Sequence, residues 1–266
     1  MILGVSYTVW DGEELLEYSI KSIRRNVDYI AVVWQKISYF GELCNDGLEA
    51  LLYDLKRQGL IDELYLYEPD MLNGGVKKAG IDETRKRNIG LWLCRENGCD
   101  YHMTMDCDEF YEDEQFKFMK KEMVQGAYGT GYAQHIQYYK DSIYQLKNPE
   151  REFISTIEKI TPKTKYIHSI SCIVPVDPTR KTNNVQEGMS YRIFTREECQ
   201  MHHLSFVRKD IGKKLKNRAS GSWTENEIQR IVDYYEKWQY PNPCMWAKQN
   251  LLEVIQVPRQ FEIYKD

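Results

Sequence analysis

The stretch DYHMTMDCDEFY, residues 100–111, decides which fold and which kind of site this chain is predicted to have. Its first half is apolar enough for a buried strand, whereas Asp106, Asp108 and Glu109 crowd its second half. Residues i and i+2 of a strand point the same way, so Asp106 and Asp108 can face one side and Cys107 the other. Two carboxylates presented together suit a hard divalent ion such as Mg²⁺ or Mn²⁺. The alternative is a solvated turn before a helix N-terminus that favours acid.

The residues before this stretch alternate between strand and helix patterns. Apolar, β-rich runs predict strands at 2–10, 29–35, 63–69 and 100–106, and amphipathic segments predict helices at 11–27, 45–61 and 82–98. We expect the third helix to be capped at Asp82 and to stop at Gly98. This order predicts a parallel sheet with helices on both faces, in which ligands bind beyond the carboxyl ends of the strands. The acidic residues lie at such an end.

The pattern changes after Tyr111. A helix is predicted at 112–126, strands at 127–140 and 201–207, a helix at 225–239, and irregular or strand-like chain at 151–195. We therefore expect one domain with two parts, a nucleotide-binding half at 1–110 and an elaborated acceptor-binding half at 111–266.

Composition narrows the class of protein. The net charge of −4 gives no electrostatic reason to expect a nucleic acid or an anionic membrane as partner. Seven scattered cysteines without a Cys-x-x-Cys pair favour a reducing, cytoplasmic setting. No stretch reaches the ~18 apolar residues of a membrane helix, which predicts a soluble protein, at most peripheral to a membrane.

The segment ETRKRNIGLWLCRENGCDYHMTMDCDEF, residues 83–110, resembles family 2-like glycosyltransferases of the GT-A fold. The matching residues are Arg87, Asn88, Gly90, Asp106 and Asp108. The resemblance implies a Rossmann-like αβα sandwich with a mostly parallel central sheet. It also implies that the Asp-x-Asp carboxylates hold Mn²⁺ or Mg²⁺ against the diphosphate of a nucleotide-sugar, with the Arg-Asn pair near the nucleoside. Without the resemblance, an exposed polar helix face would explain Arg87 and Asn88 equally well.

The opening VSYTVWDGEELLEYSIKSI, residues 5–23, is similar to the same family, in which a polar turn after the first strand contacts the base and ribose. Tyr7, Thr8 and Trp10 occupy that turn. The family often has an acidic residue after the second strand that touches the base. Gln35 stands near that point here, which leaves the identity of the nucleotide open.

A third similar segment is MHHLSFVRKDIGKKLKN, residues 201–217. The resemblance implies that His203 is the third protein ligand of the metal, and a neutral imidazole suits Mn²⁺ better than Mg²⁺. The basic residues that follow, Arg208 and Lys214 among them, could neutralise the departing diphosphate, although a charge run is usually a solvated face. For His202, which alternates with Leu204 and Phe206, we expect a place in the core.

The resulting expectation is a metal-dependent glycosyltransferase that moves a sugar from a nucleotide-sugar to a glycan or lipid-linked acceptor. An inverting displacement needs a general base. Asp141, Glu187 and Glu197 are the candidates, and Glu187 is slightly preferred because it lies in a flexible-looking loop. A nucleotidyltransferase is an alternative, although SYTVWDGEE is not the Gly-rich phosphate loop usual in that class. A non-catalytic nucleotide- or carbohydrate-binding domain is the third possibility.

Overall fold

Strands and helices alternate through the first part of the chain, as the sequence predicts. The computed structural model describes residues 1–70, 76–148, 151–218, 223–246 and 250–263. The elements of the first part are β1 (Leu3–Val9), α1 (Glu13–Ile23), η1 (Arg24–Asn26), β2 (Tyr29–Trp34), α2 (Leu48–Arg57), β3 (Glu63–Leu66), α3 (Val76–Glu96) and β4 (Tyr101–Asp106).

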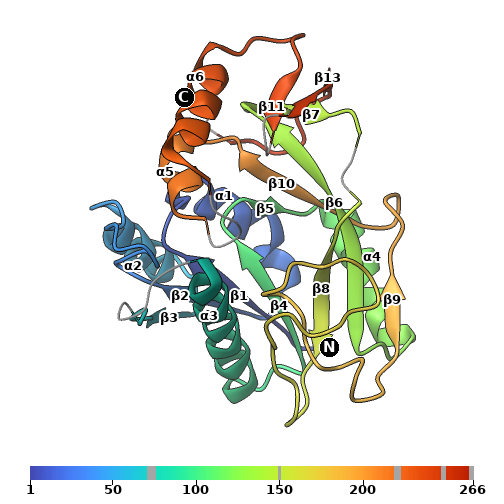
Figure 1. Cartoon of the computed structure of the whole chain (residues 1–266). Coiled ribbons are helices and arrows are strands. Elements are labelled where there is room, and N and C mark those ends of the chain that lie inside the picture. The colour runs from blue at the N-terminus through green and yellow to red at the C-terminus, as the bar shows by residue number, and fades with distance from the viewer. Residues whose placement is uncertain (71–75, 149–150, 219–222, 247–249, 264–266) are drawn as a thin grey trace.

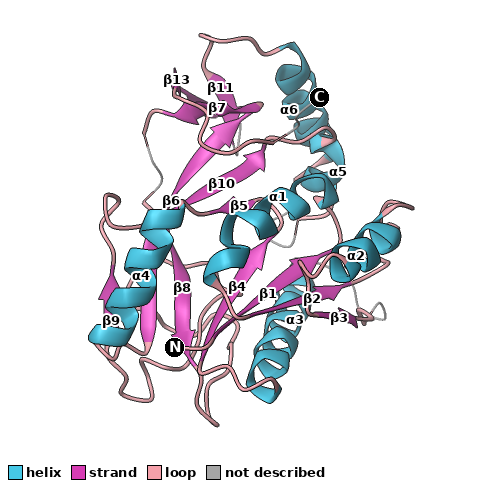
Figure 2. Cartoon of the chain, turned by 180° about the vertical axis from the view of Figure 1, so that it is seen from behind, coloured by secondary structure: helices cyan, strands magenta, loops and turns pink. Residues whose placement is uncertain are grey.

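These four strands form the predicted parallel core of the sheet. They lie in the order β4-β1-β2-β3, and every neighbouring pair is parallel. All seven residues of β1 are buried, as expected for a parallel strand covered on both faces. Helices α1, α2 and α4 (Asp113–Gln125) cover one face, and α3 packs on the other against β1 and β2 (Figures 1 and 2). The α/β sandwich inferred from the sequence is therefore confirmed.

The second part of the chain extends the same sheet and adds smaller elements. They are β5 (Glu109–Phe110), β6 (Thr130–Tyr139), β7 (Asp141–Leu146), β8 (Phe153–Lys159), β9 (Tyr191–Ile193), β10 (Gln200–Phe206), α5 (Ile211–Lys216), α6 (Glu225–Lys237), β11 (Cys244–Trp246), β12 (Asn250–Leu252) and β13 (Val254–Gln256). The antiparallel strand β8 joins β4 to β6. Strand β10 pairs with both β6 and β5, which carries a late part of the sequence to the end of β4.

The third helix begins earlier than predicted. Helix α3 starts at Val76, so Asp82 lies inside it and does not cap it. The side chain of Asp82 is buried and accepts hydrogen bonds from Tyr67 and Arg85 instead. Residues 76–81, which precede the predicted helix, are thus helical, and residues 71–75 lie outside the described chain. The predicted end holds, because Gly98 has a φ of 76° just after the helix.

Within the described chain, no helix combines the length and the apolarity that crossing a membrane requires.

Candidate functional site

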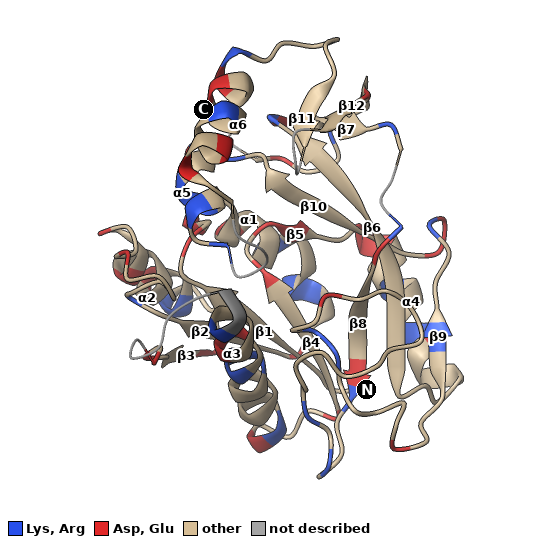
Figure 3. Ribbon diagram, in the orientation of Figure 1, with Lys and Arg blue, Asp and Glu red and all other residues tan. Residues whose placement is uncertain are grey.

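A pocket of about 310 Å³ opens at the carboxyl end of the parallel core. Thr8 of β1 and Asp106 of β4 are partners in the parallel register, so both strands deliver side chains to the same edge. Acidic residues at the tip of β4 lie between basic residues of α3 and α5 (Figure 3). Eight residues singled out from the sequence line this pocket: Thr8, Trp10, Gln35, Asp106, Asp108, His203, Arg208 and Lys214.

Asp106, the last residue of β4, is surrounded by hydrogen-bond donors. Its Oδ1 accepts from Thr8 Oγ1 at 2.6 Å and from Arg87 Nη2 at 3.3 Å. Its Oδ2 accepts from Arg180 Nη2 at 2.5 Å, and Arg180 also pairs with the buried Glu109. About a third of the Asp106 side chain remains exposed to the pocket.

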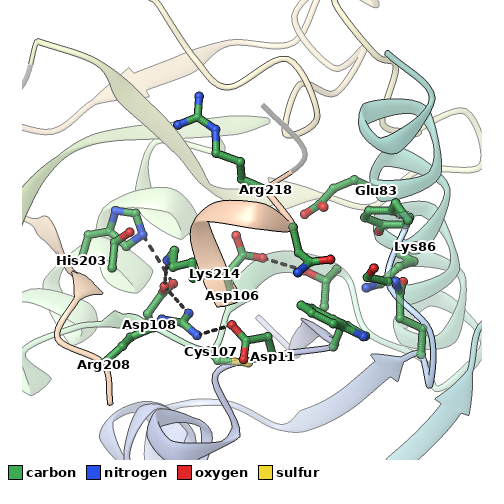
Figure 4. Close-up of a pocket in the computed structure, with 17 residues that line it drawn as sticks. Asp11, Glu83, Lys86, Asp106, Cys107, Asp108, His203, Arg208, Lys214 and Arg218 are labelled. Carbon is green, nitrogen blue, oxygen red and sulfur yellow. Dashed lines mark hydrogen bonds and ion pairs between the residues drawn. The ribbon is translucent and has the colours of Figure 1, made fainter. Parts of the chain in front are cut away.

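Asp108 lies in the turn that follows β4 and is almost completely buried. Its Oδ2 accepts from Arg208 Nη2 at 2.6 Å and from Lys214 Nζ, and its Oδ1 lies 3.4 Å from His203 Nε2 (Figure 4). The pairing of His203 with Glu109 in the β10–β5 ladder brings the histidine to this turn. Because the strand ends at Asp106, the two-residue alternation assumed from the sequence does not extend to Asp108, and Cys107 also lines the pocket.

Gly12 allows Arg208 to reach its partners. It has a φ of 85°, a conformation that side chains disfavour. A Cβ at this position would lie 2.7 Å from Arg208 Nη1. With that space free, Arg208 bridges Asp108 and Asp11, to which it donates at 2.9 Å. The polar turn after β1 is therefore shaped around a buried guanidinium.

The basic side chains keep both aspartates ionised. Burial alone would raise the pKa of Asp106, but Arg180 and Arg87 outweigh it and hold that pKa well below its ordinary value. Burial is likewise outweighed at Asp108, where Lys214 and Arg208 lower the pKa. The two carboxylates are thus paired anions at neutral pH.

The opposite wall of the pocket comes from the chain after β2 and from α3. Gln35 and Tyr39 line it, together with Lys86, which is 3% exposed. The ammonium of Lys86 lies 5.6 Å from the centroid of the Tyr39 ring. Burial lowers the pKa of Lys86 to about 8. Trp10 is held by a hydrogen bond from its indole N–H to the Glu42 carbonyl oxygen and adds an aromatic surface.

The residues expected to bind a metal do not fit a divalent-cation site as they are arranged. His203 and Asp108 lie side by side, but Asp106 and Asp108 each have two basic partners. In the described part of the chain, no group of three or more His, Cys, Asp or Glu residues is placed to hold a metal ion.

Three residues predicted to lie near the nucleoside do not line the pocket. Tyr7 is buried beneath it, with its hydroxyl 3.1 Å from Ser19 Oγ. Asn88 ties α3 to the chain at Tyr166 through both its amide nitrogen and its amide oxygen. Arg87 lies behind the pocket wall, where it supports Asp106.

The candidates for the general base lie elsewhere. Asp141 begins β7 and pairs with Arg259 at 3.0 Å, and Glu187 pairs with Lys163 at 3.3 Å. Glu197 is exposed. None of the three lines the pocket. The expectation that His202 is a core residue is confirmed, because it is fully buried and its Nδ1 lies 2.8 Å from the Tyr138 hydroxyl.

Three basic residues of the site, Lys86, Arg180 and Arg218, were missed in the sequence. Arg180 comes from the irregular middle of the chain, where no periodicity marks a functional position. Lys86 could have been found, because Glu83, Lys86 and Arg87 lie within about one helical turn of one another.

A scan against protein-family models finds no match, and neither does a search of curated proteins. The fold itself is an α/β sandwich whose core strands β4, β1, β2 and β3 are parallel. Among solved structures, the chain is similar to S. aureus TarS 1–349, with a TM-score of 0.48 and 10% identity over 88% of this chain and 70% of that one. It is also similar to S. aureus TarS, with a TM-score of 0.46 and 9% identity over 89% of this chain and 43% of that one. For S. aureus TarS 1–349 in complex with UDP, the TM-score is 0.44 and the identity is 8%, over 89% of this chain and 71% of that one.

Proposed function

We propose that the chain is a glycosyltransferase that moves a sugar, of the hexosyl class, from a nucleotide-diphosphate donor to a glycan or lipid-linked acceptor. The observation that carries the proposal is the pocket at the carboxyl ends of β1 and β4, with an ionised acidic pair held among basic side chains. Open α/β sheets bind ligands at this edge. A pocket of about 310 Å³ is at the lower end of the range for small-molecule sites.

The chemistry of glycosyl transfer suits such a site. Cleavage of the bond between the sugar and the diphosphate leaves negative charge on the departing phosphate. Lysine and arginine side chains placed beforehand in a partly dry pocket stabilise that charge. Lys214, which contacts Asp108, and Arg218 line the pocket, and Trp10 and Tyr39 offer aromatic surface to a nucleoside. We propose that residues 1–110 form the nucleotide-binding half and residues 111–266 the acceptor-binding half, with Lys214 and Arg218 of the second half reaching the diphosphate.

An inverting transfer would require a general base within hydrogen-bond reach of the acceptor hydroxyl. The sequence offers Asp141, Glu187 and Glu197 as candidates. Because none of them lines the pocket, we assign the base to none of them. Dependence on Mn²⁺ or Mg²⁺, which the resemblance implies, is likewise left out of the proposal, because the described residues do not fit such a site.

The cysteines support a cytoplasmic setting for this activity. All seven are free thiols, as expected in a reducing compartment.

Thermal shift with a panel of nucleoside diphosphates tests the proposal. A ligand that binds the folded protein raises its melting temperature in proportion to ln(1 + [L]/Kd). We expect at least one diphosphate to stabilise the protein and Asp106→Ala to remove the shift. Asp141→Ala, which changes an aspartate outside the pocket, should keep it. A chain that responds to no nucleoside diphosphate would contradict the proposal.

A further inference from the structure

The acidic pair is enclosed by basic side chains from separate parts of the chain. Arg87 from α3 and Arg180 from the loop after β8 approach Asp106. Arg208, which follows β10, and Lys214 from α5 approach Asp108. Sites for divalent cations instead have an excess of carboxylate charge for the ion to neutralise. Here the protein neutralises both carboxylates itself.

The contacts of Asp108 leave little room for a divalent cation. Its Oδ2 accepts from both Arg208 and Lys214, and its Oδ1 faces His203. A divalent ion bound to that Oδ2 at about 2.1 Å would lie about 4 Å from the Arg208 guanidinium nitrogen. Two like-charged groups at that distance, in a turn that is almost completely buried, repel each other strongly. The ion would have to displace the basic side chains before it could bind.

Lys214 keeps N–H donors to spare after its contact with Asp108. An ammonium group has three N–H donors, and Lys214 gives one of them to Asp108. It can therefore bind a phosphate oxygen without leaving its carboxylate. Arg208 is buried and donates from one Nη atom to Asp11 and from the other to Asp108, while its Nε makes no hydrogen bond to a described residue. Its role is to hold Asp108 in place.

Lys86 points independently to an anionic ligand. Its side chain is buried, yet its Nζ makes no hydrogen bond or ion pair with any residue that the structure describes. The ammonium lies 5.6 Å from the centroid of the Tyr39 ring, and the nearby carboxylates of Glu83 and Asp106 only partly offset the effect of burial on its pKa. A buried cation is costly unless it is paired. In Figure 4, Lys86 lies on one side of Asp106. Asp108 and its basic partners lie on the other side of Asp106, in the same pocket.

We infer that Lys86 and Lys214 bind the diphosphate of the nucleotide donor, and that Asp106 and Asp108 position basic side chains instead of holding a divalent cation. This inference rests on the proposed function and adds how its donor is recognised. The charge on the leaving diphosphate is balanced by two ammonium groups from opposite walls of the pocket. Arg180 and Arg208 keep the acidic pair in position between them.

The test is a calorimetric titration of the whole chain with UDP, GDP, CDP and ADP, each in EDTA and each with Mg²⁺ or Mn²⁺. For the nucleotide that binds, we expect affinity in EDTA to lie within about tenfold of the affinity with metal. Lys86→Met and Lys214→Met should each weaken binding in EDTA by about 10- to 100-fold. Lys216→Met, an exposed lysine on the same short helix as Lys214, is the matched control and should change nothing.

The outcomes separate a failure of this inference from a failure of the proposed function. Tightening by metal of about tenfold or more would overturn the inference and leave the glycosyltransferase proposal standing. Unchanged affinity in both lysine variants would overturn the assigned roles of these lysines. No binding of any diphosphate, with or without metal, would instead overturn the proposed function. The comparison of EDTA with metal uses the unaltered chain, so it remains decisive even if a variant does not fold.

Discussion

Replacing Arg180 by methionine should destabilise the protein strongly, because this guanidinium neutralises buried carboxylates. It donates to Asp106 and to both oxygens of Glu109, which is 2% exposed. After the substitution Asp106 keeps Thr8 and Arg87, whereas Glu109 keeps the Asp106 amide and loses its charged partner. Removing one partner of a buried ion pair costs about 3–5 kcal/mol. For a chain of this size, that corresponds to a fall in melting temperature of about 6–20 °C.

The pH dependence of the loss gives a second readout. In the wild type, burial opposes the ionisation of Asp106, but Arg180 outweighs burial and the pKa of Asp106 is low. The pairing of Asp106 with Arg180 therefore stabilises the fold at pH values above the ordinary pKa of a carboxylate. Burial already raises the pKa of Glu109 in the wild type, with Arg180 opposing the rise. Without Arg180, the pKa of Glu109 should rise further, and that of Asp106 should rise above its value in the unfolded chain. The variant should then lose stability as pH rises through that range, and its deficit should shrink as pH falls and the buried acids bind protons.

Urea unfolding of the wild type, Arg180→Met, Glu109→Gln and the double variant measures these effects as a cycle. Glu109→Gln should recover part of the loss in the Arg180→Met background, because it removes the carboxylate left without a cation. A loss below about 1 kcal/mol, or a loss that Glu109→Gln does not reduce, would refute the reasoning.

Further perturbations test other contacts. Gly12→Ala should destabilise the chain by more than Gly59→Ala. Both glycines have a positive φ, but of the two only Gly12 would bring a Cβ against the Arg208 side chain. Equal urea midpoints for the two variants would contradict this. Burial raises the pKa of Glu158 to about 8, so wild-type stability should fall between about pH 4.5 and 8, where the unfolded chain alone ionises this residue. Glu158→Gln should flatten that decline in thermal melts, and an unchanged slope would show that another group causes it. Because burial lowers the pKa of Lys86 to about 8, diphosphate affinity should weaken as pH rises from 7 to 9, and calorimetry of Lys86→Met should lack that component.

The sequence predicted the parallel core because its signals are local. The largely apolar run of β1 and the acidic end of β4 could be recognised from the sequence pattern and position alone, and the parallel register then places Thr8 beside Asp106. The beginning of α3 was missed because Asp82 has the chemistry of a helix cap but is used in a buried contact with Tyr67. Local propensity does not reveal that kind of tertiary contact.

The partners of the acidic pair depend on long-range contacts that no local pattern encodes. Arg180 lies 74 residues from Asp106 in sequence, and Arg208 lies 100 residues from Asp108. The sequence therefore indicated carboxylates in need of a cation, and a metal was the natural candidate. The fold instead places arginine and lysine side chains there. His203 was predicted beside Asp108 because a resemblance linked the two segments, and the structure brings them to 3.4 Å.

The most direct test of the central claim is the product released from nucleotide-sugars by the purified chain, followed by mass spectrometry. Glycosyl transfer, or the slow hydrolysis that accompanies it, breaks the bond between the sugar and the diphosphate and releases a nucleoside diphosphate. We predict that at least one donor in a panel yields that product and that Asp106→Ala abolishes its formation. Release of a nucleoside monophosphate, which requires cleavage between the two phosphates, or recovery of every donor intact, would contradict the account.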